Sequence, residues 1–164
     1  SLGGFGVGNT ETLLDGLRAI KTPVQILAMC GKNEELKIKL ERESASDGKA
    51  RVIPVGYTRD MDEYMSASDL IVGKPGGLTT CEALAKGLVF VIANPIPGQE
   101  ERNADHLLEQ GCAIRSNNPA TLGYKIEQLI SDPQRLSTMR ANALKFARPN
   151  AAFDIADTLA RMAN

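Results

Sequence analysis

The chain has 164 residues, 24% of them charged, and a net charge of −1 at pH 7. This balance supplies neither a basic field for nucleic acid nor an acidic excess, so we expect local binding sites and no nucleic-acid partner. No apolar run approaches the roughly 20 residues of a membrane span. The length predicts one domain, since domains commonly hold roughly 100–200 residues.

The cysteines and the single histidine bear on compartment and metal binding. Cys30, Cys81 and Cys112 have no Cys-x-x-Cys spacing, and we expect buried thiols in a reducing cytoplasm. His106 has no His/Cys cluster around it in the sequence, so a structural zinc site or a Cys–His nucleophile pair lacks its parts. The sequence therefore predicts a cytoplasmic protein without a metal site.

Strand and helix patterns alternate along the chain. Residues 1–9 have the pattern of a strand end and a glycine loop, and Asn9 or Thr10 can cap the helix that follows. Short apolar runs bounded by turn residues predict buried parallel strands. Strands are predicted over residues 24–30, 51–55, 69–72, 88–93 and 111–114, and helices over residues 34–43, 60–67, 119–131, 133–146 and 151–162.

This alternation predicts an α/β fold, a Rossmann-like doubly wound parallel sheet with helices on both faces, followed by C-terminal helices. No repeat or internal linker interrupts the pattern, so residues 1–164 are expected to form a single domain. Because ligands of such sheets bind at the carboxyl ends of the strands, the loops that follow the strands are the candidate site.

Residues 71–85 have the pattern of a strand, a glycine turn and a helix. Gly76 and Gly77 permit a sharp turn and the close approach of a ligand, while the helix N-terminus directs free N–H groups at an anion. Thr79 and Glu82 also have the spacing of a capping box, and a lysine stands four residues after Glu82. Glu82 therefore has structural interpretations, as a cap or an ion-pair partner, beside a ligand-binding one.

A second glycine loop lies at residues 3–8. If a G-x-G-x-x-G motif began at Gly4, its third glycine would fall at Asn9, and residues 29–32 lack the acidic residue that NAD binding requires. P-loop spacing is absent as well. NAD is therefore disfavoured, but two glycine-rich helix starts at one edge of a sheet still predict a diphosphate site.

Residues 73–83 and 94–103, together with residues 3–8, 30–33 and 55–58 in the same order, resemble a known family. They are similar to the C-terminal domain of the GT-B glycosyltransferases that include diacylglycerol glucosyltransferases, monogalactosyldiacylglycerol synthases and, more distantly, MurG. The resemblance implies the donor-binding half of an inverting, UDP-sugar-dependent enzyme that transfers a hexose to a diacylglycerol-type lipid. UDP-sugar would be a substrate, and no cofactor would be required.

The resemblance also implies a role for each segment. The glycine loop at residues 4–6 would lie near the diphosphate, and the backbone of residues 57 and 58 would meet the uracil. N–H groups of residues 76–79 would bind the phosphates, Glu82 the ribose hydroxyls, and the segment 98–103 the transferred sugar. The expected donor-binding residues are Gly4, Phe5, Gly6, Tyr57, Thr58, Gly76, Gly77, Leu78, Thr79, Glu82, Gly98, Gln99, Glu100 and Asn103.

Nothing in the chain matches the N-terminal domain of these enzymes, which would bind the acceptor and supply the catalytic base. We therefore expect an N-terminal partner domain in the parent protein, an inactive isolated chain, and no catalytic residue within it. The expected localisation is cytoplasmic, with the full-length protein peripheral at the membrane where its lipid acceptor lies. Two alternatives stay open: a sugar-nucleotide epimerase of the same fold, and a nucleotide-binding module without chemistry.

Overall fold

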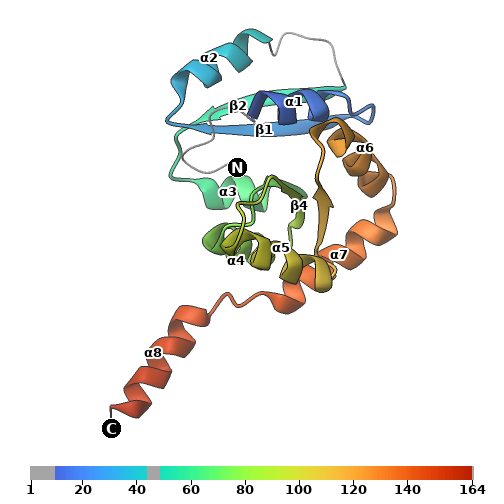
Figure 1. Ribbon diagram of the computed structural model, residues 1–164. Coiled ribbons are helices and arrows are strands. Elements are labelled where there is room, and N and C mark those ends of the chain that lie inside the picture. The colour runs from blue at the N-terminus through green and yellow to red at the C-terminus, as the bar shows by residue number, and fades with distance from the viewer. Residues whose placement is uncertain (1–9, 44–48, 164) are drawn as a thin grey trace.

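The computed structural model describes residues 10–43 and 49–163 (Figure 1). The predicted strand end and glycine loop, with Gly4, Phe5 and Gly6, lie outside these ranges. Helices and strands alternate from the first described element to β5, as predicted. The elements are α1 (Thr10–Arg18), β1 (Val24–Gly31), α2 (Glu34–Glu43), β2 (Ala50–Gly56), α3 (Met61–Ser66), β3 (Leu70–Gly73), α4 (Gly77–Ala85), β4 (Val89–Ala93), α5 (Gln99–Glu109), β5 (Ala113–Ser116), α6 (Pro119–Ile130), α7 (Pro133–Phe146) and α8 (Ala151–Met162).

The described strands form two parallel sheets, one with the order β1-β2 and one with the order β3-β4-β5. We predicted one continuous sheet, and β1 and β3 are not paired within the described ranges. Pro54 lies inside β2, opposite Ala28 of β1. Among the described strands β2 pairs with β1 alone, and proline within a sheet is typical of such an edge strand.

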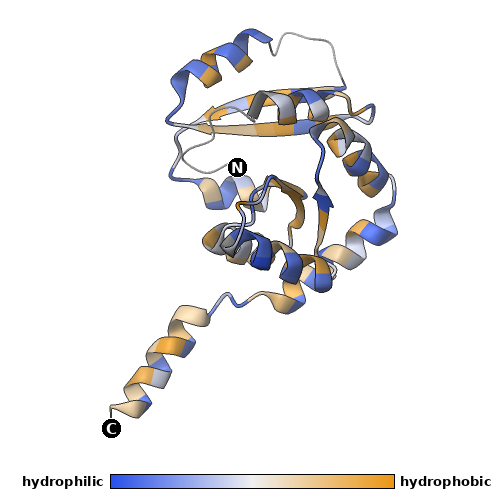
Figure 2. Ribbon diagram, viewed as in Figure 1, coloured by the Kyte–Doolittle hydropathy of each residue, from blue (hydrophilic) through white to orange (hydrophobic). Residues whose placement is uncertain are grey.

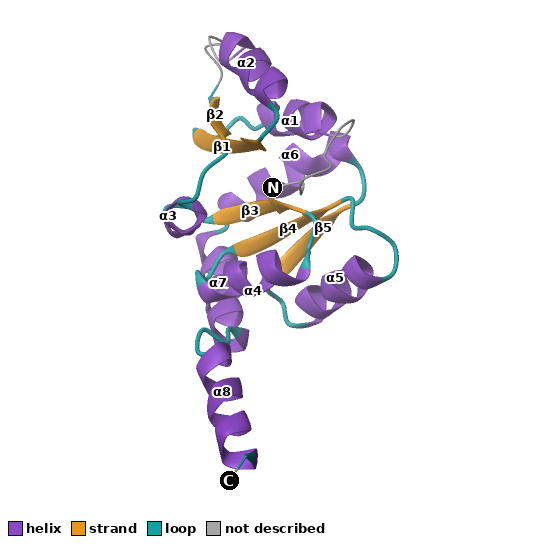
Figure 3. Cartoon of the chain, turned by 90° about the vertical axis from the view of Figure 1, so that its left-hand side faces the viewer, coloured by secondary structure: helices purple, strands orange, loops and turns teal. Residues whose placement is uncertain are grey.

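The strand β4 is the centre of the larger sheet, and its side chains are at most 1% exposed. Alternate side chains of a strand point to opposite faces. Phe90 and Ile92 pack with residues of α4 and α5, whereas Val91 and Ala93 pack with residues of α1 and α6. Figure 3 shows these two helix pairs on opposite sides of the sheet. This arrangement confirms the predicted α/β class.

The two sheets share one core. The cluster that holds Val91 also contains Cys30 of β1 and Val52 of β2. Burial raises the pKa of the Cys30 and Cys112 thiols. Cys81 is exposed, so the prediction of a buried thiol is wrong there, because it lies outside the face of α4 that Thr80, Ala83 and Leu84 bury.

Helices α1 and α6 cross at two glycines. A Cβ added to Gly123 would lie 2.2 Å from the carbonyl oxygen of Gly16, and one added to Gly16 would lie 2.4 Å from the carbonyl oxygen of Pro119. Both distances are far below van der Waals contact, and both meet backbone atoms that cannot rotate away. The backbones of these helices therefore approach each other as closely as they do because both positions lack side chains.

A carboxylate ties α6 to the turn before β1. Glu127 accepts hydrogen bonds from the backbone N–H groups of Lys21 and Thr22, the latter at 3.0 Å, and from the Thr22 hydroxyl at 3.0 Å. Desolvation alone would raise the pKa of Glu127, but these hydrogen bonds and the nearby Lys21 charge together lower it. The ionised form is therefore the one that stabilises the fold.

We expect this carboxylate to make stability depend on pH. A lowered pKa in the folded state adds stability above the unfolded glutamate value of about 4.3, and that stability is lost as pH falls through the folded pKa. Glu127→Gln should lower the melting temperature by several degrees at pH 7, measured by circular dichroism. The difference from the wild type should shrink toward pH 3, whereas an equal difference at both pH values would contradict the assignment.

Helix α8 extends away from the body of the domain (Figure 1), and all of its residues are exposed. Its boundaries agree with the prediction for residues 151–162. Figure 2 shows hydrophobic residues alternating with hydrophilic ones along it. Phe153, Ile155, Leu159 and Met162 are 61–79% exposed.

Candidate functional site

The turn between β3 and α4 leaves helix N–H groups free. Gly76 is the N-cap residue of α4, and no side chain caps the helix. The Thr80 N–H bonds to the Gly76 carbonyl and so begins the helical ladder. By helix geometry the N–H groups of residues 77–79 have no intrahelical acceptor. The positive end of the helix dipole coincides with them, so the turn favours an anion.

The glycines of this turn are not explained by the fold. Gly76 has φ −65° and ψ 151°, which any residue can adopt, and Gly77 does not have a positive φ either. A Cβ on Gly76 or Gly77 would meet no atom of the described structure within 4 Å. We predicted that these glycines permit a sharp turn and the close approach of a ligand, and the observed backbone conformation does not require glycine. Their missing side chains leave open space on the first turn of α4, among the residues that the structure describes.

Glu82 lies inside α4 and not at its start. The predicted capping box is wrong, because the helix begins at Gly77, so Thr79 is already its third residue. The alternative ion pair with Lys86 is not formed either, since Lys86 Nζ lies 2.6 Å from Asp62 Oδ1. The Glu82 carboxylate is exposed and has no hydrogen-bond or ion-pair partner among the described residues. Both structural interpretations of Glu82 therefore fail.

The segment after β4 reaches the same turn. We predicted over residues 94–103 a proline-stiffened loop that runs into a helix, and α5 begins at Gln99, so Glu100 and Asn103 lie on a helix whose N-cap is Gly98. Asn103 Nδ2 donates a hydrogen bond of 2.8 Å to the Pro75 carbonyl. This bond joins two segments 28 residues apart and leaves the Asn103 Oδ1 atom as an acceptor.

Two left-handed residues bound the loop before α5. Asn94 has φ 49° and Gly98 has φ 93°, values that favour glycine and that asparagine adopts more readily than most residues. The buried Asn94 Nδ2 atom has no partner among the described residues. The Glu100 carboxylate accepts a hydrogen bond from the Ile96 N–H and so closes the loop onto the helix. Strained residues and unsatisfied polar groups of this kind concentrate at functional sites.

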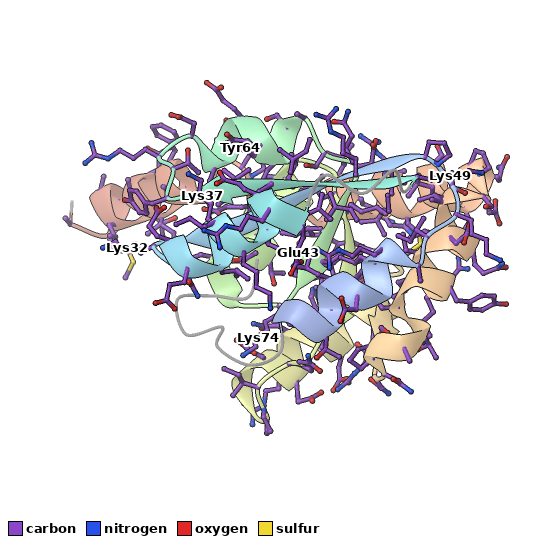
Figure 4. All side chains as sticks on the ribbon, turned by 90° about the horizontal axis from the view of Figure 1, so that it is seen from above. Lys32, Lys37, Glu43, Lys49, Tyr64 and Lys74 are labelled. Atoms are coloured by element: carbon purple, nitrogen blue, oxygen red, sulfur yellow. The ribbon has the colours of Figure 1, made fainter. Side chains whose placement is uncertain are left out.

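Tyr57 and Thr58 follow β2. Tyr57 is 64% exposed, and Lys32 Nζ lies 5.7 Å from the centre of its ring. The Asp60 N–H donates to the Thr58 hydroxyl at 2.9 Å. Figure 4 shows Lys32 at the left of the view, Lys49 at the right, and Lys74 between them in its lower part. Lys32 and Lys74 each directly follow the carboxyl end of a strand, β1 and β3, where a positive charge would attract an anion.

Sequence reasoning missed the contacts that connect these segments. Neither the bond from Asn103 to Pro75 nor the stacking of Lys32 on Tyr57 has a signal in local spacing. Leu78, like Gly77, is exposed on the first turn of α4. A hollow of about 380 Å³, lined by residues of α2 such as Glu35 and Arg42, does not include the turn. In the part of the chain that the structure describes, the candidate site is therefore an open edge of the domain, with Gly77 and Leu78 exposed.

Comparison with known proteins identifies the family. A model of the family "Glycosyltransferase family 28 C-terminal domain" matches residues 10–158. The chain belongs to this family. It is 32% identical over 164 residues to a processive diacylglycerol beta-glucosyltransferase of Staphylococcus aureus (strain Newman), a match that covers 97% of this chain and 41% of the relative. The family 28 domain described here therefore spans about two fifths of the length of that relative.

Solved structures confirm the fold of this family 28 domain. Acinetobacter baumannii MurG superposes with a TM-score of 0.80 at 23% identity, covering 93% of this chain and 46% of MurG. The glycotransferase of kitacinnamycin superposes with a TM-score of 0.54 at 17% identity, covering 85% of this chain and 44% of that protein. The resemblance to a GT-B half, inferred from the glycine turn and the segment 94–103, is confirmed.

Two further findings concern metal and membrane. In residues 10–43 and 49–163, no three His, Cys, Asp or Glu side chains gather in a way that could hold a metal ion. Within the same ranges, no helix has both the length and the apolar character needed to cross a bilayer.

Proposed function

We propose that this family 28 domain binds the UDP-sugar donor of an inverting glycosyltransferase that transfers a hexose to a diacylglycerol-type lipid. The observation that carries the proposal is the open space in front of Gly76 and Gly77, at a helix start with no capping side chain. Among the described residues, neither packing nor backbone conformation requires glycine there, which supports a ligand that must approach the backbone. The similarity to the S. aureus diacylglycerol beta-glucosyltransferase supports the lipid acceptor.

In this proposal the first turn of α4 performs two tasks. Its free N–H groups bind the diphosphate, and the dipole, equivalent to roughly half a positive charge, stabilises the charge that grows on UDP as it leaves. Glu82 accepts hydrogen bonds from both ribose hydroxyls, and the backbone of Tyr57 and Thr58 meets the uracil. The start of α5, with Gly98, Gln99, Glu100 and Asn103, reads the sugar. No metal or organic cofactor is required in this scheme.

The remaining chemistry lies in another part of the parent protein. We propose that an N-terminal domain binds the acceptor and supplies the base that removes the proton from its hydroxyl. The relative is more than twice as long as the matched segment, which leaves room for such a domain. The exposed apolar residues of α8, for which the described structure offers no cover, suit packing against it. A cytoplasmic enzyme, peripheral at the membrane, fits a lipid acceptor.

Calorimetric titration tests the proposed donor. The chain should bind UDP and at least one of UDP-glucose, UDP-galactose and UDP-N-acetylglucosamine, while NAD produces no heat of binding. Because the free N–H groups act on the diphosphate, UDP should bind more tightly than uridine. Binding of NAD without UDP would overturn the assignment, and binding of no nucleotide at all would overturn the donor site as it stands in this chain.

Replacement of the free carboxylate should separate binding from stability. We expect Glu82→Ala to weaken UDP binding by about tenfold or more, because hydrogen bonds to charged groups contribute about 1.5–3 kcal/mol. The melting temperature should hardly change, since the side chain is exposed and unpartnered. Glu109→Ala, at the exposed far end of α5, is the matched control and should change neither quantity. A fall in stability with unchanged affinity would return Glu82 to a structural role.

A further inference from the structure

An ion pair lies behind the first turn of α5. Arg115 Nη2 of β5 donates a hydrogen bond of 2.8 Å to Glu101 Oε1, and the two side chains are 28% and 34% exposed. Neither residue was among the expected site residues. Glu101 is the third residue of α5, so its carboxylate fixes the turn that carries the proposed sugar contacts.

Arg115 is itself held firmly. Its backbone pairs with Ile92 at the centre of the buried sheet. Its carbonyl accepts a hydrogen bond of 2.6 Å from Lys125 Nζ of α6. The guanidinium Nε atom is buried and has no partner among the described residues. The Arg115 backbone is fixed, and its Nε atom has no hydrogen-bond partner among the described residues. The position of the guanidinium therefore depends on its ion pair with the Glu101 carboxylate.

Three contacts therefore locate the start of α5. The Glu100 carboxylate joins it to the preceding loop, Asn103 joins it to the Pro75 carbonyl of the glycine turn, and Glu101 joins it to the sheet. The first two contacts join the helix start to a loop and to a turn. Of the three, the ion pair is the contact that joins the helix start to a strand of the sheet, β5.

We propose that Arg115 is a positioning residue for sugar recognition. Through Glu101 it holds the first turn of α5 at a fixed place relative to the phosphate-binding turn, without touching the ligand. This inference rests on the proposed donor site and assigns to it a residue that lies outside the matching motifs. Because the ion pair acts on α5 and not on α4, its loss should affect the sugar and leave the UDP part unchanged.

Titration of the 164-residue chain with UDP and with UDP-glucose, UDP-galactose and UDP-N-acetylglucosamine tests this role. We expect Arg115→Met and Glu101→Gln each to weaken binding of the tightest-binding sugar nucleotide by about fivefold, which is the upper range for a partly exposed ion pair. The affinity for UDP should stay within about twofold of the wild-type value. The double variant should lose no more than either single one, because both remove the same contact. Arg115→Lys, which keeps the charge, should recover part of the affinity.

The ratio of sugar-nucleotide to UDP affinity distinguishes positioning from general stability. If the variants bound UDP and the sugar nucleotide more weakly by the same factor, the positioning role would be overturned and the donor site would stand. The same holds if the melting temperature fell while the ratio of the two affinities stayed unchanged. Additive losses in the double variant would also overturn it. If the wild-type chain bound none of these nucleotides, the donor site and this inference would fall together.

Discussion

Gly123→Ala should lower the free energy of unfolding by about 3 kcal/mol, since overpacking against atoms that cannot rotate costs about 1–3 kcal/mol or more. The new Cβ would lie 2.2 Å from the Gly16 carbonyl oxygen, so α1 and α6 must move apart. The gain of about 1 kcal/mol from replacing a helical glycine is too small to offset this. Urea unfolding followed by circular dichroism measures the effect.

The matched control is a glycine with free space around it. Gly77→Ala also introduces one methyl group into a helix, but no atom of the described structure lies within 4 Å of the added Cβ. Gly16→Ala should resemble Gly123→Ala, because its Cβ would meet the Pro119 carbonyl at 2.4 Å. If Gly123→Ala unfolded at the same urea concentration as the wild type, the close crossing of α1 and α6 would be wrong.

Gly77→Ala should have the opposite effect from Gly123→Ala, because it should reduce ligand binding and not stability. We expect UDP affinity to fall by about tenfold to one hundredfold, because the methyl group occupies the space in front of the free N–H groups and charge-assisted hydrogen bonds contribute about 1.5–3 kcal/mol. Stability should stay the same or rise by up to about 1 kcal/mol, since alanine favours the helix more than glycine does. Calorimetric titration and thermal melting of the same sample separate the two effects.

Gly87, at the other end of α4, supplies the control for this experiment. It has φ 66°, and an added Cβ would lie 3.1 Å from the Leu144 side chain. Gly87→Ala should therefore reduce stability and leave UDP affinity unchanged. If Gly77→Ala kept full UDP affinity, the open space in front of the turn would not be the phosphate site, and the proposed function would lose the observation that carries it.

Prediction from sequence was least accurate at the ends of elements. The sequence predicts the glycine turn but also allows Thr79 as the cap of α4, whereas the helix begins at Gly77 and its N-cap is Gly76. The last strand was predicted at residues 111–114 and is Ala113–Ser116, because Gly111, with φ 64°, still belongs to the turn after α5. Several residues near each boundary satisfy the same local preferences, and tertiary contacts choose among them.

The sequence by itself determined the α/β class, the order of the elements from α1 to α8, and the two motifs at residues 73–83 and 94–103. These follow from hydrophobic periodicity and from residue types that act within a few positions of the chain. Only the tertiary structure decided that Gly76 and Gly77 are free of packing demands and that Glu82 has no structural partner among the described residues. It alone joined Asn103 to Pro75 and Arg115 to Glu101. Such contacts form because parallel strands place loops that are far apart in the sequence at one edge of the sheet. Local residue spacing does not show which of these loops become neighbours.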